Sequence, residues 1–225
     1  MSIGKNKNTI ILGIIPARGG SKTIPKKNIK NMAGKPLIAW TIDSAKKSKL
    51  LDRFVVSTED KEIGDISKKY GAEVLARPEK LAGDKVSIIF VLKDVLRKTK
   101  ADIVVLLQPT SPIKEKDLID KCLKRFIAKK ADSLATGFMC YLYEWGKYQK
   151  QRQDLKAWFH DDGNVYILKA DLIKKAKNLN EAWGRKREKF LISKEQNFEI
   201  DDEFDFWINE QILIKKYKKN KTLIK

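Results

Sequence analysis

The chain has 225 residues, of which 42% are hydrophobic, and its formal net charge is +19. This hydrophobic fraction is ordinary for a globular protein and too high for a disordered one. No apolar run approaches the roughly 20 residues that a membrane-spanning helix needs, and residues 1–9 lack the pattern of a secretory leader. We therefore expect a cytoplasmic protein without a membrane partner.

Apolar and amphipathic segments alternate along residues 10–138. We predict five strands, at residues 10–15, 51–57, 73–76, 102–107 and 133–138. We also predict four helices. The first begins at Pro36, the second follows a cap formed by Ser57 or Thr58, and the others cover residues 86–98 and 115–129. Such alternation is typical of a doubly wound, mainly parallel sheet. The predicted fold class is therefore α/β, with a Rossmann-like arrangement.

The pattern changes over residues 139–162, which are rich in Tyr, Trp, Lys and Gln. We predict that this segment is an insertion or arm outside the sheet. Beyond it we expect strands at residues 164–168, 190–193 and 198–200, and helices over residues 170–177 and from 203 to about 217. No internal repeat or linker divides the chain, so a single domain over residues 1–225 is expected.

The excess of lysine allows a second class of protein, one that binds nucleic acid. The lysines are spread along the whole chain, with only a modest cluster at residues 215–221, and no zinc-finger spacing or RNP-type strand accompanies them. We therefore expect no nucleic-acid partner, and a basic nucleic-acid-binding protein remains an alternative that depends on charge alone.

A glycine-rich, basic loop follows the first predicted strand. Its candidate ligand-binding residues are Arg18, Gly19, Gly20, Ser21, Lys22, Lys27 and Asn28. Glycines let the backbone turn sharply toward a ligand, and fixed cations neutralise phosphate oxygens. An open α/β sheet binds nucleotides at this position. The loop is neither a Walker-type loop nor a dinucleotide fingerprint, and a solvated basic turn is the alternative.

Two later segments carry polar side chains suited to a site at the same edge of the sheet. Gln108 follows a buried strand, where a polar residue usually faces a ligand. Glu199 and Asp201 point the same way if their segment is extended. Mg²⁺ favours one or two carboxylates together with phosphates and water, so Asp201 is the best metal candidate. Asp202 and Asp205 are expected to be helix-capping or solvated acids.

The opening loop, IPARGGSKTIPKKN at residues 15–28, resembles the signature of the acylneuraminate cytidylyltransferase family, which comprises the CMP-sialic acid synthetases and their relatives. Further segments resemble that family in the same order, at residues 57–63, 77–87, 106–112, 152–154, 162–167 and 199–205. The resemblance implies the nucleotide-diphospho-sugar transferase type of sheet with a small protruding arm. It also implies a homodimer, in which residues 139–162 reach across to the partner.

The implied activity is transfer of CMP from CTP to an acidic, nonulosonic or sialic-type sugar, with Mg²⁺ or Mn²⁺ as cofactor and a role in surface glycans such as lipopolysaccharide. The resemblance assigns catalysis to Lys27, Arg18 and Asp201, with Lys27 stabilising charge on the α-phosphate. The resemblance adds Arg77 and Ser87 to the loop residues that bind the nucleotide. It implies that the acceptor sugar is bound by Gln108, Arg152, Asp162 and Tyr166. It implies that the metal is bound by Asp201 and Glu199.

Several alternatives stay open. Asp84 either orients its loop or caps a helix, and Tyr166 either faces the acceptor or packs in the core. Asp162 stands where the family usually has Asn, and Glu199 stands where it often has Asp. These departures leave the acceptor undecided and allow an inactive member that only binds nucleotide. A CMP-Kdo synthetase or another sugar nucleotidyltransferase is the nearest alternative enzyme.

Overall fold

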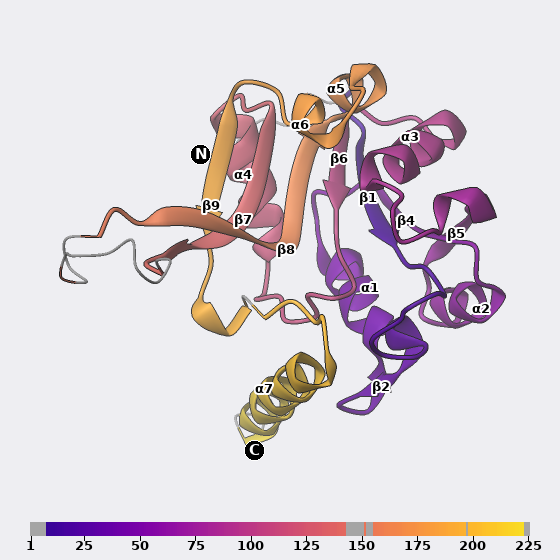
Figure 1. Cartoon of the computed structure of the whole chain (residues 1–225), viewed down its shortest axis with the longest axis vertical. Coiled ribbons are helices and arrows are strands. Elements are labelled where there is room, and N and C mark those ends of the chain that lie inside the picture. Colours follow the sequence, from indigo (N-terminus) through magenta and orange to yellow (C-terminus); the bar gives the residue numbers. More distant parts are fainter. Residues whose placement is uncertain (1–7, 143–150, 152–154, 197, 223–225) are drawn as a thin grey trace.

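The computed structural model describes residues 8–142, 151, 155–196 and 198–222, with side chains described as far as residue 216. A seven-stranded sheet in the order β5-β4-β1-β6-β8-β7-β9 forms its centre (Figure 1). The strands are β1 (Ile11–Pro16), β4 (Arg53–Thr58), β5 (Glu73–Ala76), β6 (Ile103–Leu106), β7 (Ser133–Cys140), β8 (Trp158–Lys169) and β9 (Arg187–Leu191). β8 is antiparallel to β6 and β7, and the other neighbouring pairs are parallel. The predicted mainly parallel sheet is confirmed.

Helices cover both faces of this sheet. They are α1 (Leu37–Lys47), α2 (Lys61–Lys69), α3 (Ile88–Lys98), α4 (Leu118–Ala128), α5 (Ala170–Lys175), α6 (Leu179–Ala182) and α7 (Glu203–Thr222), joined by short 3-10 helices η1 (Lys27–Ile29), η2 (Glu79–Leu81) and η4 (Lys194–Gln196). A small hairpin of β2 (Asn31–Met32) and β3 (Lys35–Pro36) precedes α1. No helix in the described ranges is long and apolar enough to cross a membrane.

The core has two layers because β1 is apolar on both faces, as a central strand of a parallel sheet is. Ile11 and Ile15 pack with α1, α2 and α4, whereas Leu12 and Ile14 pack with α3, α5 and α6. A third cluster joins the loop after β1 to α1 and α7. Its buried members are Ile24, Met32, Leu37, Trp40, Ile113, Ile200, Phe206 and Leu213. This cluster holds α7 and the segment before it against the predicted phosphate loop.

Most predicted elements agree with the structure to within a few residues, and three predictions are wrong. Ser57 and Thr58 end β4, where they pair with β5, so they do not cap α2. Asp60 caps this helix instead, and its side chain accepts the Ile63 N–H at 2.9 Å. The short strand predicted at residues 198–200 is absent, and the Ile200 N–H donates to the Thr110 carbonyl at 2.9 Å.

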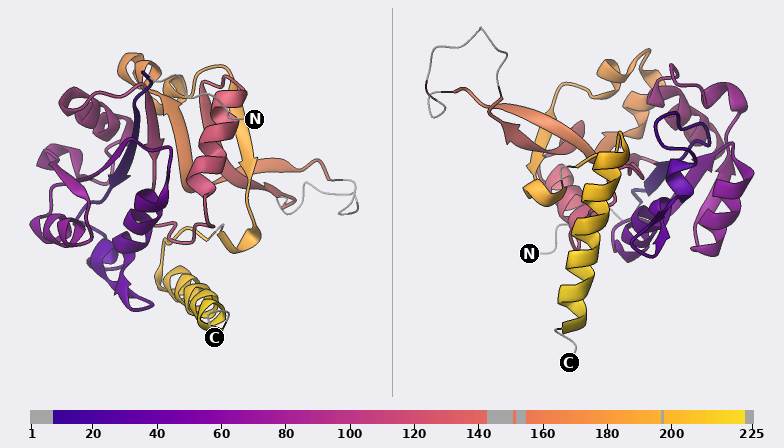
Figure 2. Two further views of the ribbon diagram at one scale, coloured as in Figure 1. Left: turned by 180° about the vertical axis from the view of Figure 1, so that it is seen from behind. Right: turned by 60° about the horizontal axis from the view of Figure 1, so that its bottom comes forward.

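The prediction that residues 139–162 lie outside the sheet is wrong at both ends of that segment. β7 continues to Cys140 and β8 begins at Trp158, and these two residues face each other in the ladder. The two strands form a ribbon that projects from the body of the molecule (Figures 1 and 2). Residues 143–150 and 152–154 lie outside the described part of the chain. The protruding arm is therefore a continuation of two strands of the sheet.

Candidate active site

A cavity of about 480 Å³ lies where the predicted loop follows β1. Four stretches of chain line it: the loop from Pro16 to Asn28, the segment from Arg77 to Val91, the turn from Gln108 to Thr110, and the pair Glu199 and Asp201. β1, β5 and β6 all end at this edge, which is where an open α/β sheet places its ligand. Of the predicted residues, Arg18, Ser21, Lys22, Lys27, Asn28, Arg77, Gln108, Glu199 and Asp201 belong to the lining.

Two cations of the loop already have an anionic partner in the cavity wall. Arg18 Nη1 lies 2.6 Å from Asp84 Oδ1, and Lys22 Nζ lies 2.5 Å from Asp84 Oδ2. These hydrogen bonds, first that of Lys22 and then that of Arg18, hold the pKa of Asp84 below its usual range. Asp84 therefore orients the loop cations. It does not cap a helix. Lys26 pairs with Glu62 and does not line the cavity.

Lys27 connects the loop to the acidic segment. Its Nζ donates to the Ile200 carbonyl at 2.7 Å. Partial burial lowers the pKa of Lys27, and the nearby carboxylates of Asp201 and Glu199 oppose that effect. A partly desolvated ammonium next to a cavity is a strong electrostatic group, because water screens it less than it screens an exposed lysine.

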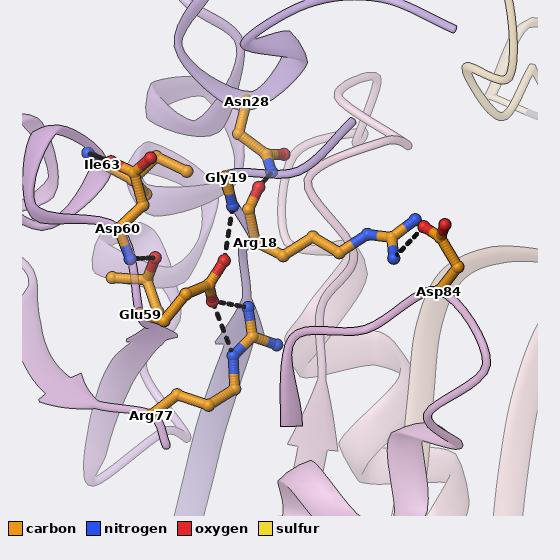
Figure 3. A network of polar contacts seen from close by, with 9 residues as sticks. Arg18, Gly19, Asn28, Glu59, Asp60, Ile63, Arg77 and Asp84 are labelled. Atoms are coloured by element: carbon orange, nitrogen blue, oxygen red, sulfur yellow. Dashed lines mark hydrogen bonds and ion pairs between the residues drawn. The ribbon is translucent and has the colours of Figure 1, made fainter. Parts of the chain in front are cut away.

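The structure explains one of the two loop glycines, Gly19, by a reason other than the predicted approach to a ligand. The Gly19 N–H donates to Glu59 Oε1 at 2.7 Å (Figure 3), so this N–H is already used within the protein. A Cβ at Gly19 would lie 2.4 Å from Asp60 Oδ2, which explains the glycine. Gly20 has open space around it, and neither glycine is part of the cavity lining. The Asn28 side chain also holds the loop, by donating to the Arg18 carbonyl at 2.9 Å.

Arg77, to which the resemblance assigned a nucleotide contact, lines the cavity and is buried and paired with an acid. Its Nε and Nη2 donate to Glu59 Oε2 at 3.0 and 2.5 Å. Glu59 thus links Arg77 to the Gly19 N–H, as Figure 3 shows. Sequence reasoning assigned no role to Glu59, whose signals were its place in the segment at residues 57–63 and its position directly after a strand that neighbours β1. Ser87 precedes α3 at the N-cap position, outside the cavity lining.

Glu199 and Asp201 both face the cavity, as predicted from their spacing. Burial raises the pKa of Glu199, and a hydrogen bond from the Thr110 hydroxyl at 3.0 Å opposes this. Asp202 and Asp205 cap α7 as expected: Asp202 Oδ1 accepts the Asp205 N–H at 2.9 Å, and Asp205 Oδ2 accepts the Asp202 N–H at 3.2 Å. This reciprocal pair resembles a capping box.

The donor set at residues 199 and 201 suits a hard divalent cation. Mg²⁺ takes one or two carboxylates from a protein and completes its shell with phosphate oxygens and water. Within the described ranges no group of three or more His, Cys, Asp or Glu side chains could hold a metal ion by itself. A cation here would complete its shell with ligands such as phosphate oxygens or water.

The residues predicted for the acceptor sugar are not all brought together. Gln108 lines the cavity, and a Cβ at Gly163 would lie 3.0 Å from its Nε2. Asp162 is buried and does not line the cavity, and its Oδ1 accepts the Thr136 hydroxyl at 2.7 Å. Tyr166 is 9% exposed and donates to Asp161 Oδ2 at 2.8 Å, which favours the core-packing alternative. Arg152 lies outside the described residues.

An open, mainly parallel sheet with a cationic loop after β1 and carboxylates facing that loop defines a nucleotide-binding α/β protein. The chain belongs to the cytidylyltransferase family, whose family model matches residues 12–223. The match confirms the predicted family and the predicted class of enzyme, a CTP-dependent cytidylyltransferase.

Two relatives illustrate the range of this similarity. CMP-N,N'-diacetyllegionaminic acid synthase of Legionella pneumophila is 33% identical over 225 residues, which cover 90% of this chain and 96% of that protein. N-acylneuraminate cytidylyltransferase of Escherichia coli is 30% identical over 237 residues, covering 96% of this chain and 54% of that protein. The chain thus spans about half the length of the second relative.

Pseudaminic acid cytidylyltransferase of Campylobacter jejuni is 34% identical over 178 residues, covering 69% of this chain and 77% of that protein. Among solved structures, CMP:2-keto-3-deoxy-manno-octonic acid synthetase complexed with CTP has a TM-score of 0.76 at 15% identity, covering 92% of this chain and 100% of that one. At this identity the likeness shows the fold alone.

Proposed function

We propose that this chain, as a single domain, transfers the cytidylyl group of CTP to an acidic sugar of the nonulosonic type and releases pyrophosphate. One observation carries the proposal: Arg18, Lys22 and Lys27 line one cavity together with Glu199 and Asp201. A triphosphate meets three cations there. The names of the relatives point to nonulosonic acids as acceptors.

The proposed reaction is a displacement at phosphorus. The anomeric hydroxyl oxygen of the sugar forms a bond with the α-phosphorus, the bond from that phosphorus to the β-phosphate oxygen breaks, and the hydroxyl proton passes to water. Arg18 and Lys22 bind the departing phosphates, and Lys27 donates to the α-phosphate, where negative charge develops. Gln108 offers an amide donor and acceptor to the sugar.

Asp201, together with Glu199, would hold Mg²⁺ or Mn²⁺, which would neutralise phosphate charge and polarise the attacking hydroxyl.

Two further parts of the chain belong to the same proposal: Arg152, which would bind the sugar, and the β7–β8 arm, which would contact a second copy of the chain. A guanidinium matches a sugar carboxylate with two parallel hydrogen bonds. The arm exposes Tyr141, Leu142 and Trp158, at 47, 81 and 50% of their surfaces, and such a patch fits contact with a second copy of the chain.

Pyrophosphate release tests the function. We would supply CTP and Mg²⁺ with N-acetylneuraminic, legionaminic and pseudaminic acids and Kdo, and use ATP, GTP and UTP as controls. Release with CTP and one nonulosonic acid, abolished in Asp201→Ala, is the expected result. Release with Kdo alone would favour the alternative enzyme, and CTP binding without release across the panel would favour an inactive member. Absence of CTP binding would contradict the proposal.

The homodimer has its own test. Light scattering on the wild type is expected to give twice the mass of one chain. Replacing Trp158 and Leu142 with Ser should lower that mass, because the substitutions remove apolar area from the arm. A matched double substitution of exposed apolar residues on α7, Phe204→Ser with Trp207→Ser, serves as the control. An unchanged mass in the arm variant would contradict the role of the arm.

A further inference from the structure

The acidic segment of residues 199–201 is anchored from two separate parts of the chain. The Thr110 carbonyl accepts the Ile200 N–H at 2.9 Å, and the Thr110 hydroxyl donates to Glu199 Oε1 at 3.0 Å. From the opposite direction, the Thr23 hydroxyl donates to the Asp201 carbonyl oxygen at 2.6 Å. Thr110 follows β6 and Thr23 lies in the loop after β1, so the two residues are independent supports.

The hydroxyls of the two threonines donate hydrogen bonds to different kinds of group, a carboxylate and a backbone carbonyl. Thr110 engages one oxygen of the Glu199 carboxylate itself, and the other oxygen is left on the side of Gly163. Thr23 engages the backbone of Asp201, whose N–H is accepted by Asp205 Oδ2 at 3.0 Å. The peptide groups on both sides of the Asp201 Cα are therefore held. No hydrogen bond is recorded for the Asp201 carboxylate in the described part of the chain, which leaves both of its oxygens available.

We propose that Thr23 and Thr110 are positioning residues, which set the direction and separation of the Asp201 and Glu199 carboxylates relative to the phosphate loop. A divalent cation then meets a pair of ligands that is already in place. The inference rests on the proposed function, because it assigns these carboxylates to the metal.

The roles of the two hydroxyls follow from their places in the chain. Thr23 and Lys27 belong to one loop, and both donate to carbonyls of the acidic segment, the second through Ile200 at 2.7 Å. The loop that is proposed to hold the triphosphate thus also sets the position of the metal ligands. Groups that orient metal ligands typically contribute about 10- to 100-fold in metal affinity. They do so without touching the metal.

The test removes each hydroxyl and keeps the shape of the side chain. The variants are Thr23→Val and Thr110→Val, with Thr23→Ser and Thr110→Ser as the matched variants that restore a hydroxyl. Mn²⁺ binding is followed by electron paramagnetic resonance on the full chain with CTP bound and no sugar, so that no turnover is needed. Each Val variant is expected to bind Mn²⁺ about tenfold more weakly, and each Ser variant is expected to bind it nearly as the wild type does.

Two further measurements separate positioning from other effects. In EDTA, CTP affinity is expected to change less than Mn²⁺ affinity does, because the two hydroxyls are occupied by Asp201 and Glu199. The thermal midpoint should fall no further than in a variant that loses one hydrogen bond elsewhere. Thr99→Val, which removes a remote hydroxyl bonded to the Val95 carbonyl, is the control for loss of a threonine. Unchanged Mn²⁺ affinity in both Val variants would overturn the inference, as would weakening that Ser does not restore. If the wild type itself fails to bind CTP, the proposed function fails instead.

Discussion

Asp84 Oδ1 lies 2.6 Å from Arg18 Nη1, and the other oxygen of the same carboxylate lies 2.5 Å from Lys22 Nζ. Two of the three cations proposed for the triphosphate are therefore paired with one acid of the cavity wall. A bound triphosphate must compete with Asp84 for these cations or share them with it, and in both cases the carboxylate opposes the approach of further negative charge.

Asp84→Asn is therefore expected to tighten CTP binding several-fold in titration calorimetry, with a smaller effect on CMP and none on cytidine. Glu62→Gln is the matched control. It removes a carboxylate 2.5 Å from Lys26 in the same loop, and Lys26 does not line the cavity. Weaker CTP binding in Asp84→Asn than in Glu62→Gln would show that Asp84 supports the nucleotide instead of competing with it.

Glu59→Gln should destabilise the fold strongly. The substitution leaves the buried Arg77 guanidinium facing an amide, and it weakens the hydrogen bond from the Gly19 N–H. Breaking a buried ion pair typically costs about 3–5 kcal/mol. Urea unfolding should show a loss of this order. Glu73→Gln, which breaks the exposed pair with Arg53, should cost less than ~1 kcal/mol. Equal losses in the two variants would contradict the structural role of Glu59.

Gly163→Ala should impair the site more than its backbone strain explains. Gly163 has φ +71°, and an added Cβ would lie 3.0 Å from Gln108 Nε2 and 3.1 Å from Glu199 Oε2. The substitution is expected to displace both side chains and to raise the KM for the sugar. Gly34→Ala is the control, because Gly34 has φ +94° with open space around it. Both variants should lose about 1–3 kcal/mol of stability from strain, and only Gly163→Ala should change the KM.

Lys114 links folding to pH. Burial of its amine, opposed by attraction to Asp162, lowers its pKa from 10.5 to about 7. Between these two values the unfolded chain binds a proton that the folded chain lacks, so the free energy of unfolding rises with pH. The slope from one group is at most about 1.4 kcal/mol per pH unit.

Lys114→Met should flatten the rise in stability between pH 7 and 10.5 and should stabilise the protein most at the acid end of that window. Urea unfolding at intervals of pH measures the slope. Lys116→Met, at an exposed lysine nearby, is the control. A slope in Lys114→Met equal to that of the control would show that Lys114 keeps its proton in the folded state.

Local patterns predicted those parts of the structure that depend on one segment at a time. The strand at Glu73–Ala76 and the caps Asp202 and Asp205 were predicted from nearby residues alone. Strand spacing placed Glu199 and Asp201 on one side of their segment, although that segment is not a strand. The β7–β8 ribbon was not predicted. Cys140 pairs with Trp158, and the pairing of these two distant residues depends on the sheet and not on the residues next to each of them.

The sequence by itself determined the family, the succession of most strands and helices along the chain, and about half of the residues that line the cavity. Short-range periodicity and motif spacing are written in consecutive residues. Only the tertiary structure decided how these residues are used. Glu59 links Gly19 to Arg77 across 40 and 18 positions of the chain, and Thr23 reaches Asp201 across 178. Contacts of this kind depend on which segments the core brings together. The cluster around Ile24 and Ile200 is what brings the acidic segment to the phosphate loop.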